Sequence, residues 1–237
     1  MSGKVFFVSG IDTGVGKTVV TGLMARWLRA AGRDVITVKM VQTGNTGFSE
    51  DLDAHREIAG MPRLREDGLG LTAPQIFAFP SSPELAARLE GRTVDLEKIA
   101  QAVAACAAAH EVVLVEGAGG LAVPLTADTL AVDFAAAQGW PLILVASGRL
   151  GSINHILLSL EAAKTRGMSV AGVVYNWCDG VDPVIDADTP AVTRRALERL
   201  GYPPVLIKVR KQVRPVFPLS AVDFSPLFAC LKGRLEK

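Results

Sequence analysis

A nine-residue run near the N-terminus, residues 10–18, constrains the fold of this chain more than any other feature. It reads GIDTGVGKT and satisfies the spacing G-x-x-x-x-G-K-T. Apolar residues 5–9 precede it and predict a strand, and residues 17–31 follow it and predict a helix. A glycine-rich turn between a strand and a helix start directs several backbone N–H groups toward one point, where they bind phosphate oxygens. The run therefore predicts a phosphate-binding loop, or P-loop, for a nucleoside triphosphate.

The side chains of this loop have separate predicted roles. Lys17 reaches the β- and γ-phosphates, and the hydroxyl of Thr18 is offered to Mg²⁺. A glycine turn that merely precedes a lysine is the alternative, and the flanking strand and helix argue against it. The predicted nucleotide-binding residues of the loop are Gly14, Val15, Gly16, Lys17, Thr18 and Val19.

The rest of the chain alternates short β-branched runs with longer stretches of helical periodicity. The predicted strands are residues 5–9, 35–39, 112–115, 142–146, 170–175 and 205–209. The predicted helices are residues 17–31, 53–59, 96–109, 128–138, 152–166 and 193–200. Most of the strands are apolar at successive positions, which is typical of parallel strands buried on both faces. Gly32, Gly139, Gly167 and Gly201 follow four of the helices, where a left-handed residue ends a helix. This order predicts an α/β fold, a doubly wound, mostly parallel sheet with helices on both faces, as in P-loop NTPases.

The chain's 237 residues fit one large α/β domain, and no repeat or low-complexity linker divides them. We therefore expect a single domain over residues 1–237. Residues 60–82 are irregular and contain three prolines, and we interpret them as a loop excursion.

Composition excludes several classes of function. A net charge of +1 without a dense basic run argues against nucleic acid and anionic membranes as partners. No stretch approaches the roughly 20 apolar residues of a membrane helix. The cysteines Cys106, Cys178 and Cys230 are isolated, which favours packing over metal or redox roles and suits a reducing compartment. These features predict a cytoplasmic protein.

Ligands of a parallel sheet bind at the carboxyl ends of its strands. Lys39 ends the second predicted strand, although by itself it could be an ordinary exposed lysine. Glu116 follows a buried strand and precedes three small residues, Gly117, Ala118 and Gly119. A carboxylate there suits a Mg²⁺ ligand, because an unpaired buried carboxylate would be costly.

Two further segments allow two interpretations each. Asp53 starts a predicted helix, so it could cap that helix or reach a metal. Residues 147–155 join a buried strand to a helix, and this junction could bind an anion on free amides or simply be a well-capped start.

Together these segments resemble the dethiobiotin synthetase family over most of the chain. The P-loop resembles the family's G-T-D-T-x-V-G-K-T, residues 39–44 resemble K-P-x-x-[ST]-G, and residues 82–87 resemble S-P-H-x-A-A. Residues 116–120 are identical to E-G-A-G-G, and residues 150–155 resemble L-G-[ST]-I-N-H. Asn176 follows the fifth strand, as the family's base-contacting asparagine does.

The chain departs from the family pattern at several positions. Ile11, Met40 and Glu84 replace a threonine, a proline and a histidine. Residues 207–211 stand where relatives often carry G-x-[IL]-P, a segment that wraps the adenine. We therefore expect a looser preference for ATP than is usual in the family.

The resemblance implies a ligase reaction. Its substrates would be 7,8-diaminopelargonic acid, CO₂ and ATP with Mg²⁺, and a carbamate would be phosphorylated by ATP before ring closure to dethiobiotin. Lys17, Lys39 and Thr13 would be catalytic, and Thr18, Asp53 and Glu116 would hold the metal. The nucleotide contacts would extend to Gly117, Ala118, Gly119 and Asn176. Thr43, Gly151, Ser152 and Asn154 would bind substrate, the last three from the partner subunit of a homodimer.

Two other classes share a P-loop. Partition-type ATPases carry a second lysine early in the loop, where this chain has Ile11 and Asp12. Amide ligases of the cobyrinic-acid type normally add a glutaminase domain, for which 237 residues leave no room. Both remain alternatives that an activity assay separates.

Overall fold

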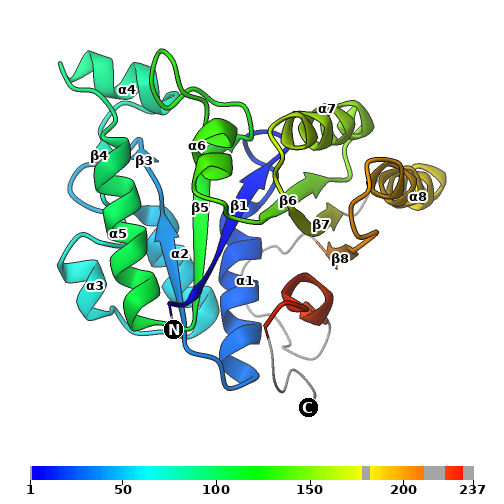
Figure 1. The fold of residues 1–237 in the computed structure, drawn as a ribbon, viewed down its shortest axis with the longest axis horizontal. Coiled ribbons are helices and arrows are strands. Elements are labelled where there is room, and N and C mark those ends of the chain that lie inside the picture. The colour runs from blue at the N-terminus through cyan, green and yellow to red at the C-terminus, as the bar shows by residue number, and fades with distance from the viewer. Residues whose placement is uncertain (1, 178–181, 211–221, 232–237) are drawn as a thin grey trace.

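The computed structural model describes residues 2–177, 182–210 and 222–231. Its centre is a six-stranded sheet in the order β2-β5-β1-β6-β7-β8 (Figure 1), and every recorded pairing in it is parallel. The strands are β1 (Lys4–Gly10), β2 (Val35–Lys39), β5 (Val112–Gly120), β6 (Leu142–Ser147), β7 (Val170–Trp177) and β8 (Leu206–Arg210). The predicted doubly wound parallel sheet is therefore confirmed.

Helices lie on both faces of this sheet. They are α1 (Lys17–Ala30), α2 (Glu50–Ala59), α3 (Arg65–Gly68), α4 (Pro83–Leu89), α5 (Leu96–Ala109), α6 (Ala131–Ala137), α7 (Ser152–Thr165), α8 (Pro183–Arg199) and the 3₁₀ helix η2 (Ser225–Phe228). Right-handed crossovers explain their sides: α1 leads toward the β2 edge, whereas α6, α7 and α8 lead toward the β8 edge, on the opposite face. On the α1 face, Trp27 stacks on Phe228 of η2 with ring centroids 6.0 Å apart.

The irregular segment contains more structure than its sequence predicts. Within residues 60–82, α3 and the short strand β4 (Ile76–Phe77) form, and β4 pairs in parallel with β3 (Gln42–Thr43) in a second sheet. Arg92 covers the buried ring of Phe77, with its guanidinium carbon 4.5 Å from the ring centroid. Two-residue strands carry no periodicity, so the sequence pattern could not reveal them.

Three predicted helices have wrong boundaries. Helix α2 begins at Glu50, because Ser49 caps it by accepting a hydrogen bond from Leu52 N at 3.2 Å. Helix α8 runs from Pro183, far before the predicted residue 193, and Pro190 inside it hid the first half. Helix α6 is shorter than residues 128–138.

The core is the sheet itself. All residues of β2 and the first seven of β5 are buried, as expected for strands covered on both faces.

Among the described residues, no helix is long and apolar enough to cross a bilayer. Cys106 is buried and Cys230 exposed, both as free thiols, whereas Cys178 and Lys211 lie outside the described residues.

The strand register places two predicted site residues together. Lys39 at the end of β2 pairs with Glu116 of β5, and Glu116 pairs on its other side with Val8 of β1. Residues at matching positions of neighbouring parallel strands point to the same face. The P-loop that follows β1 opens at this same carboxyl edge of the sheet.

Candidate active site

The P-loop turns directly from β1 into α1. Gly14 and Gly16 have φ values of 72° and 93°, in the left-handed region where side chains are disfavoured. A Cβ on Gly16 would also lie 2.1 Å from Nδ2 of Asn176. Glycine at this position is therefore required both by the turn and by the neighbour, and α1 begins at the next residue, Lys17.

Lys17 is 7% exposed and points back over the loop, with Nζ 3.3 Å from the carbonyl oxygen of Asp12. Burial lowers its pKa, the Lys39 ammonium lowers it further, and the charge of Glu116 opposes both effects. An ammonium that burial disfavours gains most when an anion arrives, which suits a phosphate contact.

A cluster of four polar side chains lies beside the loop. The ammonium of Lys39 is 2.6 Å from Oδ2 of Asp51 and 2.9 Å from Oε1 of Glu116, and it also donates to the carbonyl oxygen of Gly117 at 3.2 Å. The hydroxyl of Thr18 is 2.8 Å from Asp51 Oδ1 and 3.1 Å from Glu116 Oε1. The cluster thus joins the start of α1, the end of β2, the middle of β5 and the first turn of α2.

Lys39 and Glu116 keep their charges although both are buried. Lys39 and Glu116 are 5% and 1% exposed. Burial opposes the charged form of Lys39, but Glu116 and Asp51 outweigh it and raise the pKa of the lysine. Burial likewise opposes the carboxylate of Glu116, but Lys39 and the imidazole of His55 hold its pKa well below the usual range.

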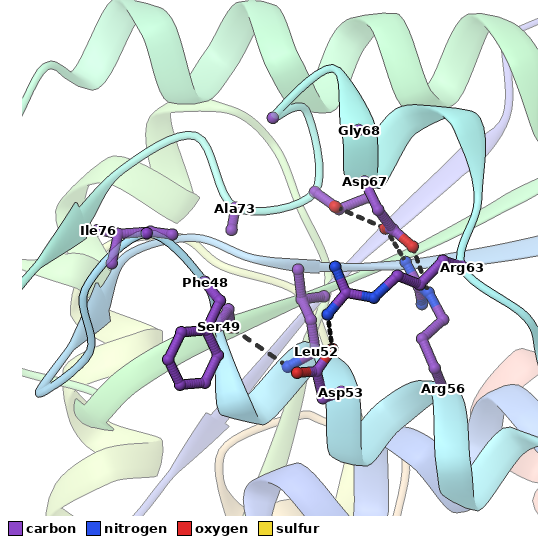
Figure 2. A pocket seen from close by; sticks show the side chains of 13 residues that line it. Phe48, Ser49, Leu52, Asp53, Arg56, Arg63, Asp67, Gly68, Ala73 and Ile76 are labelled. Atoms are coloured by element: carbon purple, nitrogen blue, oxygen red, sulfur yellow. Dashed lines mark hydrogen bonds and ion pairs between the residues drawn. The ribbon is translucent and has the colours of Figure 1, made fainter.

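The predicted metal residue Asp53 is not in this cluster, and Asp51 takes its place. Figure 2 shows Asp53 paired with Arg63, at 2.9 Å, on the wall of a separate pocket. Residues two apart on a helix point about 200° from each other, so Asp51 and Asp53 cannot serve the same site. The metal role of Asp53 was assigned by the family resemblance, and the structure places this side chain away from the cluster. With the start at Ser49, Asp51 belongs to the first turn and faces the sheet.

His55 is the second residue that the sequence interpretation missed. It is fully buried, and its Nε2 lies 2.6 Å from Glu116 Oε2. Asp51 and His55 are four residues apart on α2, so they share one helix face. This four-residue spacing, in a helix counted from the Ser49 cap, was the sequence signal that could have identified His55.

Asn176 packs against the P-loop from β7. Its Nδ2 donates to the carbonyl oxygen of Val15 at 3.0 Å. Its Oδ1 is buried, and within the described part of the chain no donor reaches it. An unused buried acceptor beside a phosphate-binding loop can accept from a ligand's amino group.

The predicted substrate residues come from the P-loop, from β3 and from the start of α7. Thr13 is exposed, and with Asp12 and the α7 residues His155 and Leu158 it lines a cavity of about 330 Å³. Asp12 also pairs with Arg149 in the β6–α7 junction, and this pair lowers the pKa of the aspartate.

The α7 start itself is partly accessible. Gly151 and Asn154 are exposed, and Ser152 is buried with its Oγ 3.3 Å from Ser147 Oγ.

Gly117 continues β5, and Gly119 has a φ of 64° beside Thr13. Thr43 is half-buried in β3, and Val19 lies in the first turn of α1.

Comparisons with known proteins identify relatives of this chain. A family profile described as an AAA domain matches residues 4–213. The chain is 46% identical to ATP-dependent dethiobiotin synthetase BioD 2 of Pasteurella multocida, over 83% of this chain and 92% of that protein. It is 47% identical to ATP-dependent dethiobiotin synthetase BioD of Chlorobaculum tepidum, over 85% of this chain and 84% of that protein.

Solved structures confirm the fold class alone. The cell division protein FtsY of Thermotoga maritima aligns over 92% of this chain and 66% of that chain, with a TM-score of 0.52 and 17% identity. Identity at that level says nothing about activity. The relatives at 46–47% identity establish the family as well as the fold. Together with the P-loop and its charged cluster, they show that the chain belongs to the ATP-dependent dethiobiotin synthetase family.

Proposed function

We propose that this chain is a cytoplasmic ATP-dependent cyclo-ligase that converts 7,8-diaminopelargonic acid and CO₂ into dethiobiotin, with ADP and phosphate as the other products. Family membership supports this activity. The observation that carries it is the pair of buried lysines: Lys39 contacts Asp51 and Glu116, and Lys17 of the P-loop lies near enough for the charges of the same two carboxylates to oppose the lowering of its pKa by burial.

The chemistry explains why two cations are needed there. One amine of the substrate adds to CO₂ and gives a carbamate, whose oxygen attacks the γ-phosphorus of ATP as the bond to ADP breaks. The second amine then attacks the carbamate carbon, phosphate leaves, and the urea ring closes. A carbamate and a triphosphate repel each other, so Lys17 and Lys39 lower the barrier by neutralising charge as it gathers on the transferred group.

The oxygen cluster fits Mg²⁺. Thr18 supplies a hydroxyl, and Asp51 and Glu116 supply carboxylates that the structure brings within hydrogen-bond distance of that hydroxyl. These are hard oxygen ligands, which Mg²⁺ prefers. A bound Mg²⁺ would neutralise phosphate charge, and the residues that would hold it are Thr18, Asp51 and Glu116.

The substrate residues are assigned by the family resemblance. Thr13 and Thr43 would hydrogen-bond the carbamate and diamine. Gly151, Ser152 and Asn154 at the start of α7 would bind the substrate carboxylate in the site of a partner subunit, within a homodimer. Exposure of Gly151 and Asn154 supports this role, because groups that serve another subunit must be accessible in the single chain.

The nucleotide-binding residues are also assigned by the family resemblance. The Gly14–Lys17 amides would surround the phosphates, and the unused Oδ1 of Asn176 would accept from the amino group of the base. Gly117, Ala118 and Gly119 let the ligand approach the end of β5.

A single assay tests the activity against its alternatives. Purified protein with MgATP and bicarbonate should release ADP only when 7,8-diaminopelargonic acid is added, with dethiobiotin formed in equal amount by mass spectrometry. Stimulation by DNA or lipid instead would indicate a partition-type ATPase. Amide formation from glutamine or ammonia would indicate an amide ligase.

A further inference from the structure

His55 connects Glu116 of the charged cluster to Thr37 of β2, and the proposed reaction assigns no role to this connection. Its ring lies in the core between α2 and the sheet and has no solvent exposure. Nε2 is 2.6 Å from Oε2 of Glu116, and Nδ1 is 3.2 Å from the hydroxyl oxygen of Thr37 on β2. A fully buried imidazole with both nitrogens engaged is a fixed structural element.

The directions of these hydrogen bonds follow from Arg56 and Glu116. Its Nη1 lies 2.6 Å from the same Thr37 hydroxyl oxygen. A guanidinium only donates, so Thr37 accepts from Arg56, and among the described residues the recorded acceptor for its own hydroxyl proton is Nδ1 of His55. Nδ1 therefore accepts from Thr37, and because a carboxylate oxygen only accepts, the ring carries its proton on Nε2, which donates to Glu116.

The guanidinium of Arg56 is held in place by Asp67. Asp67 accepts from its Nε at 3.0 Å and from its Nη2 at 2.6 Å, a two-point fork on the wall of the pocket in Figure 2. Asp67 is anchored further by Leu64 N at 2.8 Å and the Thr72 hydroxyl at 2.7 Å. Bidentate pairs of this kind fix orientation as well as distance.

We propose that His55 is a positioning residue for Glu116, and that the chain Asp67–Arg56–Thr37 holds His55 in the Nε2–H tautomer that this role requires. His55 occupies Oε2 of Glu116, which leaves Oε1 directed at Thr18 and Lys39. With one oxygen held, the carboxylate cannot rotate away from the cluster. The inference rests on the proposed role of Glu116 as a metal ligand.

The tautomer can be measured on the unmodified protein. The chain has three histidines, so ¹⁵N spectra of the imidazoles are simple, and the His55→Gln spectrum identifies the signals of His55. We expect a protonated Nε2 and an unprotonated Nδ1. Thr37→Ser keeps the hydroxyl and should keep this pattern, whereas Thr37→Val removes the donor to Nδ1 and should shift the Nδ1 signal toward that of an imidazole nitrogen without a hydrogen bond. A proton on Nδ1 in the unmodified protein would overturn the hydrogen-bond chain.

The positioning role is tested by metal affinity, without turnover. Mn²⁺ binding in the presence of ADP can be followed by electron paramagnetic resonance. His55→Leu removes the donor and should weaken Mn²⁺ binding about 10- to 100-fold. His55→Gln retains an N–H donor near the position of Nε2 and should recover most of the loss. Unchanged affinity in folded His55→Leu would overturn the role.

A double variant separates positioning from general damage. If His55 acts through Glu116, adding His55→Leu to Glu116→Gln should weaken Mn²⁺ binding no further. A full additional loss would mean that His55 acts elsewhere, and the proposal would fail. Absence of Mn²⁺ binding by the unmodified protein would instead overturn the metal assignment of the proposed function, while the tautomer is read independently.

Discussion

Lys39 is a buried lysine that stays charged. Its ammonium contacts Asp51 and Glu116 at 2.6 and 2.9 Å, and these carboxylates raise its pKa against the effect of burial. The position also differs from the exposed rim that a strand-end lysine suggests. Removing it therefore affects stability as well as catalysis, because two carboxylates lose their partner.

Lys39→Ala should lower dethiobiotin formation about 10²- to 10³-fold, the usual effect of losing one transition-state donor. It should also lower the free energy of unfolding, measured in urea. Lys4→Ala is the matched control, since Lys4 is an exposed lysine of β1. Near-normal turnover in Lys39→Ala would remove this lysine from the mechanism.

Asp51 and Asp53 form a natural pair for testing the metal site. Asp51→Asn removes a charge beside Thr18 and Lys39, whereas Asp53→Asn changes only an exposed pair with Arg63. We expect a large fall in turnover for Asp51→Asn, eased by raised Mg²⁺, and little change for Asp53→Asn. The opposite ranking would restore Asp53 as the ligand.

At the scale of elements, α2 brings the most chemistry to the site. Its cap at Ser49 sets the rotation of the helix, so that Asp51 and His55 face Glu116 while Asp53 faces outward. The hydroxyl of Ser49 also donates to Oε1 of the buried Gln42 at 2.6 Å, which ties the cap to β3. One hydroxyl thus fixes both the start and the orientation of the helix.

Strand β8 bears on nucleotide preference. It runs as a regular strand to Arg210, in the segment where relatives often have G-x-[IL]-P. The guanidinium carbon of Arg210 lies 5.4 Å from the ring centroid of Trp177. We predict that turnover with ATP exceeds that with GTP or CTP by less than about 100-fold, or about 2.7 kcal/mol. Measurements at matched Mg²⁺ decide this, and a larger ratio would show that base recognition lies elsewhere.

At the scale of the whole molecule, Glu116 links stability to pH. Because its folded-state pKa lies below the ordinary value of 4.5, it stabilises the fold above that value and loses this contribution as pH falls below it. Glu116→Gln should therefore lose less stability than the unmodified protein between about pH 7 and pH 3 in urea unfolding. Parallel acid profiles for the two proteins would contradict the linkage.

Assembly provides the last test. If Lys39 and Asn154 of different subunits share a site, mixing Lys39→Ala with an inactive Asn154 variant should restore activity. Random pairing makes half the dimers mixed, and each mixed dimer has one intact site, so about a quarter of all sites should recover. Verified subunit exchange without recovery would show that each site belongs to one chain.

The sequence by itself determined the sheet, the P-loop and the family. Buried parallel strands are continuous apolar runs, and a phosphate loop needs glycines and a lysine at set spacings, so both are visible locally. Lys17, Thr18, Lys39 and Glu116 were identified in this way, because each lies within or directly after such a pattern. The predicted strand 112–115 even ended next to Glu116, although β5 continues through Gly120.

Only the tertiary structure decided which residues complete the charged cluster. Asp51 rather than Asp53 reaches it because the Ser49 cap rotates α2, and a shift of two residues turns a side chain to the opposite side of a helix. His55 meets Glu116 across 61 positions of sequence, a contact that no local pattern encodes. Residues that lie within a motif were therefore predictable, whereas those that reach the cluster through packing of α2 against the sheet were not.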